Sequence, residues 1–151
     1  MTQSTYDTYL ENEVLHADPL QLVCILYRAA LDATASARLH LRNGEILVRS
    51  RCVSKATGII HELLQSLDAG APEEIRGNLA ALYVYMLERM TQANAEQTDA
   101  PLAEVERLLG TLLEAWSKAA SGVARNLSNS GPDSGPDSLP DSEYARLSCS
   151  Y

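Results

Sequence analysis

The stretch "NLAALYVYMLERMTQAN" (Asn78–Asn94) decides the fold class, because its large apolar residues recur at helical spacing instead of alternating. Successive residues of a helix are about 100° apart, so one side of this helix carries Leu79, Leu82, Tyr83, Met86, Met90 and Ala93. Val84 and Tyr85 project well away from that side. A helix that buries one face uses only about half of the run "LYVYML" (Leu82–Leu87). The stretch therefore predicts an amphipathic helix with surplus apolar residues outside its core face.

Helix-start and helix-stop signals predict three further helices. Asp18 as N-cap and Pro19 at the first helical position begin one helix, and Asn43-Gly44 ends it. Pro72, followed by two glutamates, begins another, and Asp99 precedes the last. The predicted helices span about 19–42, 45–67, 72–94 and 99–125. No segment alternates with period two for long enough to be a strand.

Four helices of about 20 residues with short connections are typical of an antiparallel four-helix bundle, so the predicted fold class is all-α. A chain of 151 residues suits one such domain. We expect an N-terminal capping segment (1–17), a helical bundle domain (18–125) and a disordered C-terminal tail (126–151). The tail repeats Ser-x-Pro-Asp and has too few apolar residues to offset the entropy of ordering. A spacer and a binding segment both fit this composition.

The predicted core consists of one apolar stripe on each helix. In the first helix it contains Leu20, Val23, Cys24, Tyr27, Leu31 and Leu41. In the second it contains Val53, Ala56, Ile60, Leu63, Leu64 and Leu67. In the fourth it contains Leu102, Val105, Leu109, Leu112, Leu113, Trp116, Ala120 and Val123. These stripes predict a single shared interior.

Composition excludes several classes of protein. The net charge of −8 argues against general nucleic-acid binding, which depends on neutralising phosphates. Three cysteines without CxxC spacing predict neither a disulfide framework nor a zinc knuckle, which fits a reducing cytosol. No apolar run approaches the roughly 20 residues of a membrane span, and the first residues lack the basic and apolar regions of a signal peptide. We therefore expect a cytoplasmic protein that does not insert into membranes.

Catalytic and metal-binding patterns are weak. The one ExxH motif, Glu13 to His16, stands alone, whereas di-iron bundles need two such motifs and further glutamates. Cys24 and Cys52 lie on or beside apolar helix faces and are interpreted as small core residues. No glycine-rich phosphate loop is present. We expect no enzyme activity, no catalytic residues, no metal and no cofactor.

Basic residues gather around the predicted turn between the first two helices. Half of all Lys and Arg residues lie there, namely Arg28, Arg38, Arg42, Arg49, Arg51 and Lys55. The acids between them are Asp32 and Glu45. Either these side chains form a solvated helix face or they meet an acidic partner.

Apolar residues outside the core stripes predict a second covered surface. They are Leu22, Ile25 and Leu26 on the first helix, Ile59 at the edge of the second stripe, and Val84 and Tyr85 on the third helix. A bundle has one interior, so such residues need another cover. That cover could be the segment before Asp18, with Tyr6, Tyr9, Leu10 and Val14, or a neighbouring copy, or a client peptide.

Four stretches resemble the FliS family of flagellin-specific export chaperones in colinear order over about residues 6–120. They are "YLENEVLHADPLQLVCILYRAA" (Tyr9–Ala30), "KATGIIHELLQSLD" (Lys55–Asp68), "NLAALYVYMLERMTQAN" (Asn78–Asn94) and "LAEVERLLGTLLEAW" (Leu102–Trp116). The chain departs from the pattern at Arg28 and Ala29, where Asp-Gly is usual, and at His16, where threonine is common. The Ser-x-Pro-Asp tail is not part of the family pattern.

The resemblance implies a bacterial cytosolic chaperone that binds the disordered C-terminal region of flagellin, prevents premature polymerisation and delivers it to the flagellar type III export apparatus. It also implies an N-terminal segment that can lie over part of the client site. The client-binding candidates are Tyr9, Val14, Leu22, Ile25, Leu26, Ile59, Val84 and Tyr85. A homodimer without client is possible on the same apolar surface. The alternative function is a non-catalytic helical bundle that self-associates as a structural or regulatory protein.

Overall fold

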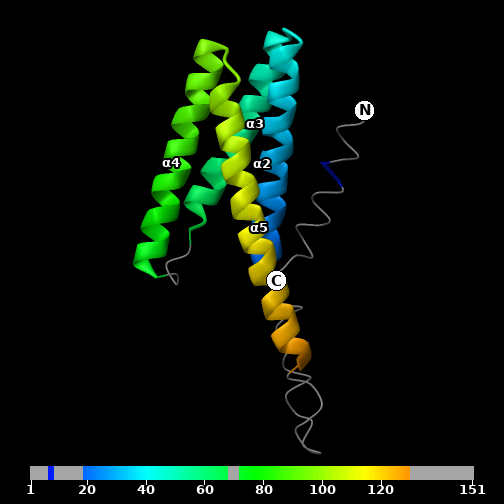
Figure 1. The fold of residues 1–151 in the computed structure, drawn as a ribbon, viewed down its shortest axis with the longest axis vertical. Coiled ribbons are helices and arrows are strands. Elements are labelled where there is room, and N and C mark those ends of the chain that lie inside the picture. The colour runs from blue at the N-terminus through cyan, green and yellow to red at the C-terminus, as the bar shows by residue number, and fades with distance from the viewer. Residues whose placement is uncertain (1–6, 9–18, 68–71, 130–151) are drawn as a thin grey trace, which may run out of the picture. The chain divides into compact units, whose positions relative to one another are not determined.

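The computed structural model describes residues 7–8, 19–67 and 72–129, with side chains described as far as Asn126. Its helices are α2 (Pro19–Arg42), α3 (Ile46–Gln65), α4 (Glu73–Glu96) and α5 (Ala100–Asn129) (Figure 1). The described ranges contain no strand, so the all-α prediction is confirmed. Helix α2 has the predicted bounds. Helix α5 extends beyond the predicted end at Arg125 and finishes at Asn129.

The chain divides into two compact units. The larger, which we call the bundle unit, runs from Leu26 to Glu114 and contains parts or all of the four helices. Ion pairs join Arg38 of α2 to Asp99, directly before α5, and Arg89 of α4 to Glu104 of α5. Helices α3 and α4 pack against each other. Neighbouring helices therefore run antiparallel, which confirms the predicted four-helix bundle.

The smaller unit combines the two ends of the chain, and its described helical parts are the start of α2 and α5 from Ala115 onward. Here the Cys24 sulfur lies 3.9 Å from the Ser117 hydroxyl oxygen. Outside the described residues lie the predicted N-cap Asp18, the predicted capping segment 1–17 apart from residues 7–8, and residues 130–151 of the predicted tail.

The core of the bundle unit is built from the predicted stripes of α3 and α4. Val53, Ala56, Ile60 and Leu63 of α3 and Tyr83, Met86, Met90 and Ala93 of α4 are buried. The hydroxyl groups of Tyr27 and Tyr83 hydrogen-bond to each other inside this core. Their ring centroids are 6.5 Å apart at an interplanar angle of 43°. Two buried hydroxyls that satisfy each other avoid the cost of an unpaired polar group.

The buried face of α2 overlaps the predicted one but is centred on small side chains that the prediction left out. Leu20, Val23, Leu31 and Leu41 are half-buried, whereas Ala30, Ala33, Thr34 and Ala37 are buried. The prediction counted large residues only, but small side chains bring a helix close to its neighbours and so occupy the tightest contacts. Cys24 and Tyr27 are buried as predicted.

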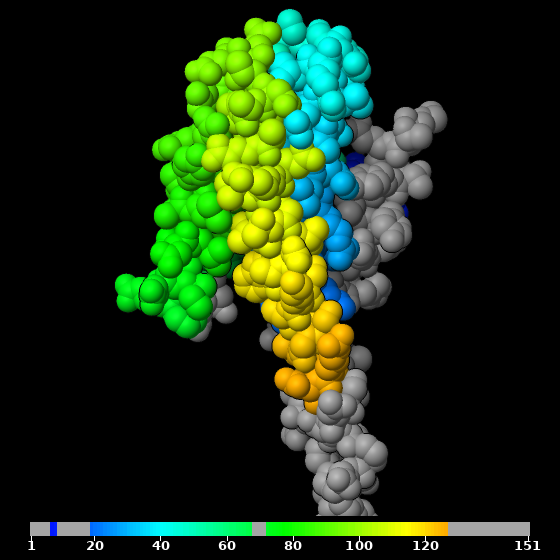
Figure 2. Space-filling model, in the orientation of Figure 1, coloured from blue at the N-terminus to red at the C-terminus, as the bar shows by residue number. Residues whose placement is uncertain are grey.

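Helix ends follow the predicted stop at Asn43-Gly44. Gly44 has φ +72°, the Gly44 amide donates to the Leu41 carbonyl at 3.2 Å, and the Glu45 amide donates to the His40 carbonyl at 2.9 Å. This pair of bonds is a Schellman motif, in which a left-handed residue satisfies the last carbonyl groups. Helix α4 ends in the same way, with Gln97 at φ 56°. Both turns lie at the same end of the bundle unit (Figure 2).

Candidate functional site

The candidate client-binding residues differ in accessibility. Tyr9 and Val14 lie outside the described residues. Leu22, Leu26 and Ile59 are half-buried, while Ile25 is only 7% exposed. Ile25 is therefore covered in this structure, although it lies outside the core stripe predicted for α2, and its role in client binding stays a prediction. Val84 and Tyr85 are 44% and 41% exposed, as expected for residues outside the core stripe.

Tyr85 is held in place on the surface of α4. Its hydroxyl donates to the carboxylate of Glu104 in α5, which also accepts from the Arg89 guanidinium at 2.8 and 2.9 Å. The hydrogen bond to Glu104 raises the pKa of Tyr85. The same bond, together with Arg89, lowers the pKa of Glu104. An aromatic ring fixed by such a network loses little side-chain entropy when a partner docks on it.

A second apolar surface lies at the end of the bundle unit away from the α2–α3 turn. Ile75, in the first turn of α4, is 51% exposed. Other residues of this end that belong to core stripes are half-buried: Leu64 and Leu67 beside the end of α3, Leu79 and Leu82 of α4, and Leu112 and Leu113 of α5. We call these seven residues the distal apolar surface. It is a continuation of the core that the described residues of the bundle cover only in part.

Sequence reasoning missed this surface. Leu79, Leu82, Leu112 and Leu113 were all predicted as core residues. The available signal was that Ile75 continues the stripe of Leu79 and Leu82 toward the start of the helix. Periodicity shows which side of a helix is apolar, but it does not show how far along the helix a neighbour covers that side.

The apolar stripe of α5 behaves similarly. Leu102, Val105 and Leu109 are buried, as predicted. Within the smaller unit, Trp116 and Ala120 are half-buried and Val123 is 49% exposed, so this part of the predicted core is not fully buried. The part of α5 within the smaller unit therefore carries accessible apolar side chains of its own.

Two of the basic residues around the α2–α3 turn are internal to the bundle. Arg38 makes two hydrogen bonds to Asp99, of 2.7 and 2.8 Å, and one of 2.7 Å to Glu106. These contacts raise the pKa of Arg38, and the bond to Arg38 lowers the pKa of Asp99. Arg49 is only 4% exposed, and its guanidinium donates to the side-chain oxygens of Asn94 and Gln97 at 3.4 Å. The interpretation that the basic residues around this turn form a solvated helix face is therefore wrong for Arg38 and Arg49.

The described residues offer little for catalysis or metal binding. In this part of the chain, no three His, Cys, Asp or Glu side chains gather where they could hold a metal ion. Burial raises the pKa of the Cys52 thiol, which makes the reactive thiolate less available. The ExxH pair Glu13 and His16 lies outside the described residues. None of the described helices is long and apolar enough to cross a membrane.

The amino-acid sequence is similar to those of known proteins. The family model described as "Flagellar protein FliS" matches residues 1–123. The chain is 38% identical over 110 residues to the flagellar secretion chaperone FliS of Salmonella typhimurium. The matched stretch covers 72% of this chain and 82% of the relative. It is 34% identical over 119 residues to the Escherichia coli chaperone of the same name, and the match covers 78% of this chain and 88% of that relative. It is 30% identical over 129 residues to the flagellar secretion chaperone FliS of Bacillus subtilis, and the match covers 85% of this chain and 96% of that relative.

Proposed function

Because this chain belongs to the FliS family of flagellar secretion chaperones, we propose that it binds the disordered C-terminal region of flagellin. It works by stoichiometric binding in the bacterial cytosol and has no catalytic step. Binding keeps flagellin from polymerising, and the complex is then delivered to the flagellar type III export apparatus. The relatives named above carry the words "flagellar secretion chaperone", which supports an export client in general.

The observation that carries the proposal is the incomplete cover of the distal apolar surface. Ile75 is 51% exposed although it lies on the core side of α4. An amphipathic client segment that folds on this surface would complete the core at that end, as helix-in-groove binding does elsewhere. A disordered client supplies such a segment because it orders only when it finds apolar cover.

The candidate residues keep separate roles in this proposal. Tyr85 and Val84 present an exposed, fixed surface on α4. Leu22, Leu26 and Ile59 are half-buried and can add contacts without large rearrangement. Ile25 can contact a client only after its present cover moves. Tyr9 and Val14 are proposed as part of that movable cover, in line with the N-terminal segment that the family resemblance implies.

The alternative is that the same apolar surface mediates self-association of a structural or regulatory bundle. A homodimer would also cover Ile75 and Tyr85, so exposure alone does not separate the two functions. The two functions differ in whether a client peptide displaces one subunit of such a dimer. A client peptide should dissociate a dimer formed on this surface, whereas a dedicated structural dimer should ignore it.

The test is isothermal titration of the full chain with a peptide that covers the C-terminal region of a flagellin. We expect one peptide per chain, and we expect Ile75→Ser and Tyr85→Ala to weaken binding. Leu47→Ser is the matched control, because Leu47 is 75% exposed at the opposite end of the bundle unit. No binding, together with a dimer that Ile75→Ser dissociates, would favour the structural alternative.

A further inference from the structure

Exposed apolar side chains gather at the α2–α3 turn, far from the distal apolar surface. Leu39 is 49% exposed, Ile46 55%, Leu47 75% and Val48 37%. We call these four residues the turn patch. They make up half of the eight large apolar side chains that are exposed in the described chain, so their clustering within residues 39–48 sets this turn apart.

The turn patch is held rigidly. The Schellman bonds at Gly44 and Glu45 fix the turn, and the Arg49 amide donates to the Glu45 carbonyl at 3.0 Å, which closes the first turn of α3. The buried Arg49 guanidinium bonds Asn94 and Gln97 and so ties this turn of α3 to the end of α4. A preformed surface loses little entropy when a partner binds.

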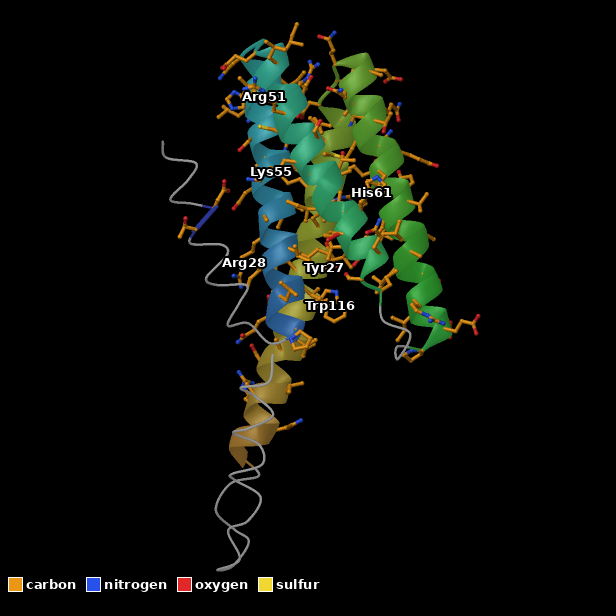
Figure 3. The ribbon with its side chains drawn as sticks, turned by 180° about the vertical axis from the view of Figure 1, so that it is seen from behind. Tyr27, Arg28, Arg51, Lys55, His61 and Trp116 are labelled. Carbon is orange, nitrogen blue, oxygen red and sulfur yellow. The ribbon has the colours of Figure 1, made fainter. Side chains whose placement is uncertain are left out.

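The charge around the turn patch is opposite to that of the whole chain. Arg42 and Arg51 are exposed, and neither forms an ion pair with a described residue. Arg51 and Lys55 follow Leu47 at intervals of four residues, so all three share one side of α3. Figure 3 shows Arg51 and Lys55 on the same side of the α2–α3 hairpin as Arg28. The nearby acids are Glu45, whose carboxylate lies 3.4 Å from the His40 ring nitrogen Nδ1, and Asp99, which bonds Arg38 and lies close enough to Arg42 for that charge to help lower the pKa of Asp99.

We propose that the turn patch, with Arg42 and Arg51, is a docking surface for an acidic amphipathic helix of another protein. Apolar side chains of that helix cover Leu47 and its neighbours, and its carboxylates face the two arginines. Charge complementarity selects an acidic partner, although the chain itself carries a net charge of −8. This surface is separate from the proposed flagellin site, so a second protein can bind while the client stays in place.

A second copy of the chain fits this surface less well. In a symmetric contact between two copies, Arg42 and Arg51 would approach their own counterparts, and like charges oppose such a contact. The chain's own C-terminal segment, which carries Asp133, Asp137, Asp141 and Glu143, is the other candidate occupant, and removing residues 130–151 in the experiment below distinguishes it.

The test uses a fluorescein-labelled peptide of about 18 residues, with leucine on one helical face and glutamate on the other, titrated with the full chain. Anisotropy should show binding that weakens as salt rises from about 0.05 to 0.5 M. The same peptide with lysine in place of glutamate should not bind. Leu47→Ser and Arg51→Glu should each weaken binding at least about tenfold, with unchanged thermal unfolding because both side chains are exposed.

Matched controls separate this surface from the client site. Ile75→Ser and Arg125→Glu remove an exposed apolar residue and an exposed arginine elsewhere, and should change acidic-peptide affinity less than about twofold. Absence of binding by the acidic peptide, or equal binding of the lysine peptide, would overturn the proposal. So would self-association that Leu47→Ser abolishes, or binding that appears only after residues 130–151 are removed. Flagellin binding by Leu47→Ser stays intact in the proposed function, so the two proposals fail independently.

Discussion

At the scale of single residues, adjacent positions of α4 have opposite environments. Met86 is fully buried, whereas Tyr85 is 41% exposed and bonds Glu104. A change of about 100° along the helix thus separates a stability residue from a binding candidate. Substitutions at the two positions should have different consequences.

Met86→Ala should lower the free energy of unfolding by roughly 2–5 kcal/mol, because it leaves a cavity in the core. Tyr85→Ala should leave the melting temperature nearly unchanged and reduce client affinity by about 1–3 kcal/mol, if the fixed ring is a hot spot. Chemical denaturation and titration calorimetry on both variants measure these quantities. Unfolding of Tyr85→Ala would show that the residue is structural and would remove it from the client surface.

Asp99 should make the bundle sensitive to acid. Its pKa is lowered by Arg38, so the folded state holds its proton less tightly than the unfolded state. The resulting stability is present above the ordinary aspartate pKa of 3.8 and is lost as pH falls through the lower pKa of the folded state. Urea denaturation of wild type and Asp99→Asn between about pH 6 and pH 2 should show a gap at neutral pH that closes in acid. A pH-independent gap would contradict this assignment.

At the scale of helices, two glycines illustrate how position decides the role of a residue type. Gly44 adopts a left-handed conformation that ends α2, whereas Gly58 lies in the middle of α3 on its exposed side. A Cβ atom at either position would meet no other atom within 4 Å. Only backbone conformation therefore distinguishes them.

Gly44→Ala should destabilise the bundle by about 1 kcal/mol, because alanine disfavours positive φ. Gly58→Ala should stabilise it by roughly 0.5–1 kcal/mol, because alanine is the better helix former. Thermal and denaturant unfolding of the two variants measure both values. The same sign for both substitutions would contradict the Schellman end of α2 or the regular helix at Gly58.

At the scale of the whole molecule, the bundle unit carries two separate apolar surfaces at its ends. The distal apolar surface extends the core stripes, and the turn patch surrounds a fixed turn. All of their residues lie between Leu39 and Leu113. The repeated Ser-x-Pro-Asp segment that follows has few apolar residues.

A chain that ends at Asn129 should therefore keep the melting temperature of the full chain, because a segment without apolar burial contributes little stability. A chain that ends at Glu114 is the control. It loses the α5 part of the smaller unit, including Trp116 and Ser117, and should melt at a lower temperature. Circular dichroism during heating measures both. A large fall in melting temperature on removing only residues 130–151 would show that the tail packs on the bundle.

The sequence by itself determined the helices, their antiparallel order and most of the core. Pro19 and Gly44 mark the ends of α2 through local backbone geometry, which needs no tertiary contact. The stripes of α3 and α4 identified Ile60 and Met86 as core residues, because burial on a helix follows its period. The exposed positions of Val84 and Tyr85 followed from the same rule.

Only the tertiary structure decided which parts of those stripes are covered and which charges are internal. Ile75 and Leu109 both lie on apolar stripes, but one is 51% exposed and the other fully buried. Arg38 and Arg51 belong to the same basic run, but one bonds Asp99 and Glu106 and the other faces outward. Period and composition are local properties of the chain. Burial and ion pairing depend on where neighbouring helices begin and end, which brings together residues as far apart in sequence as Arg38 and Asp99.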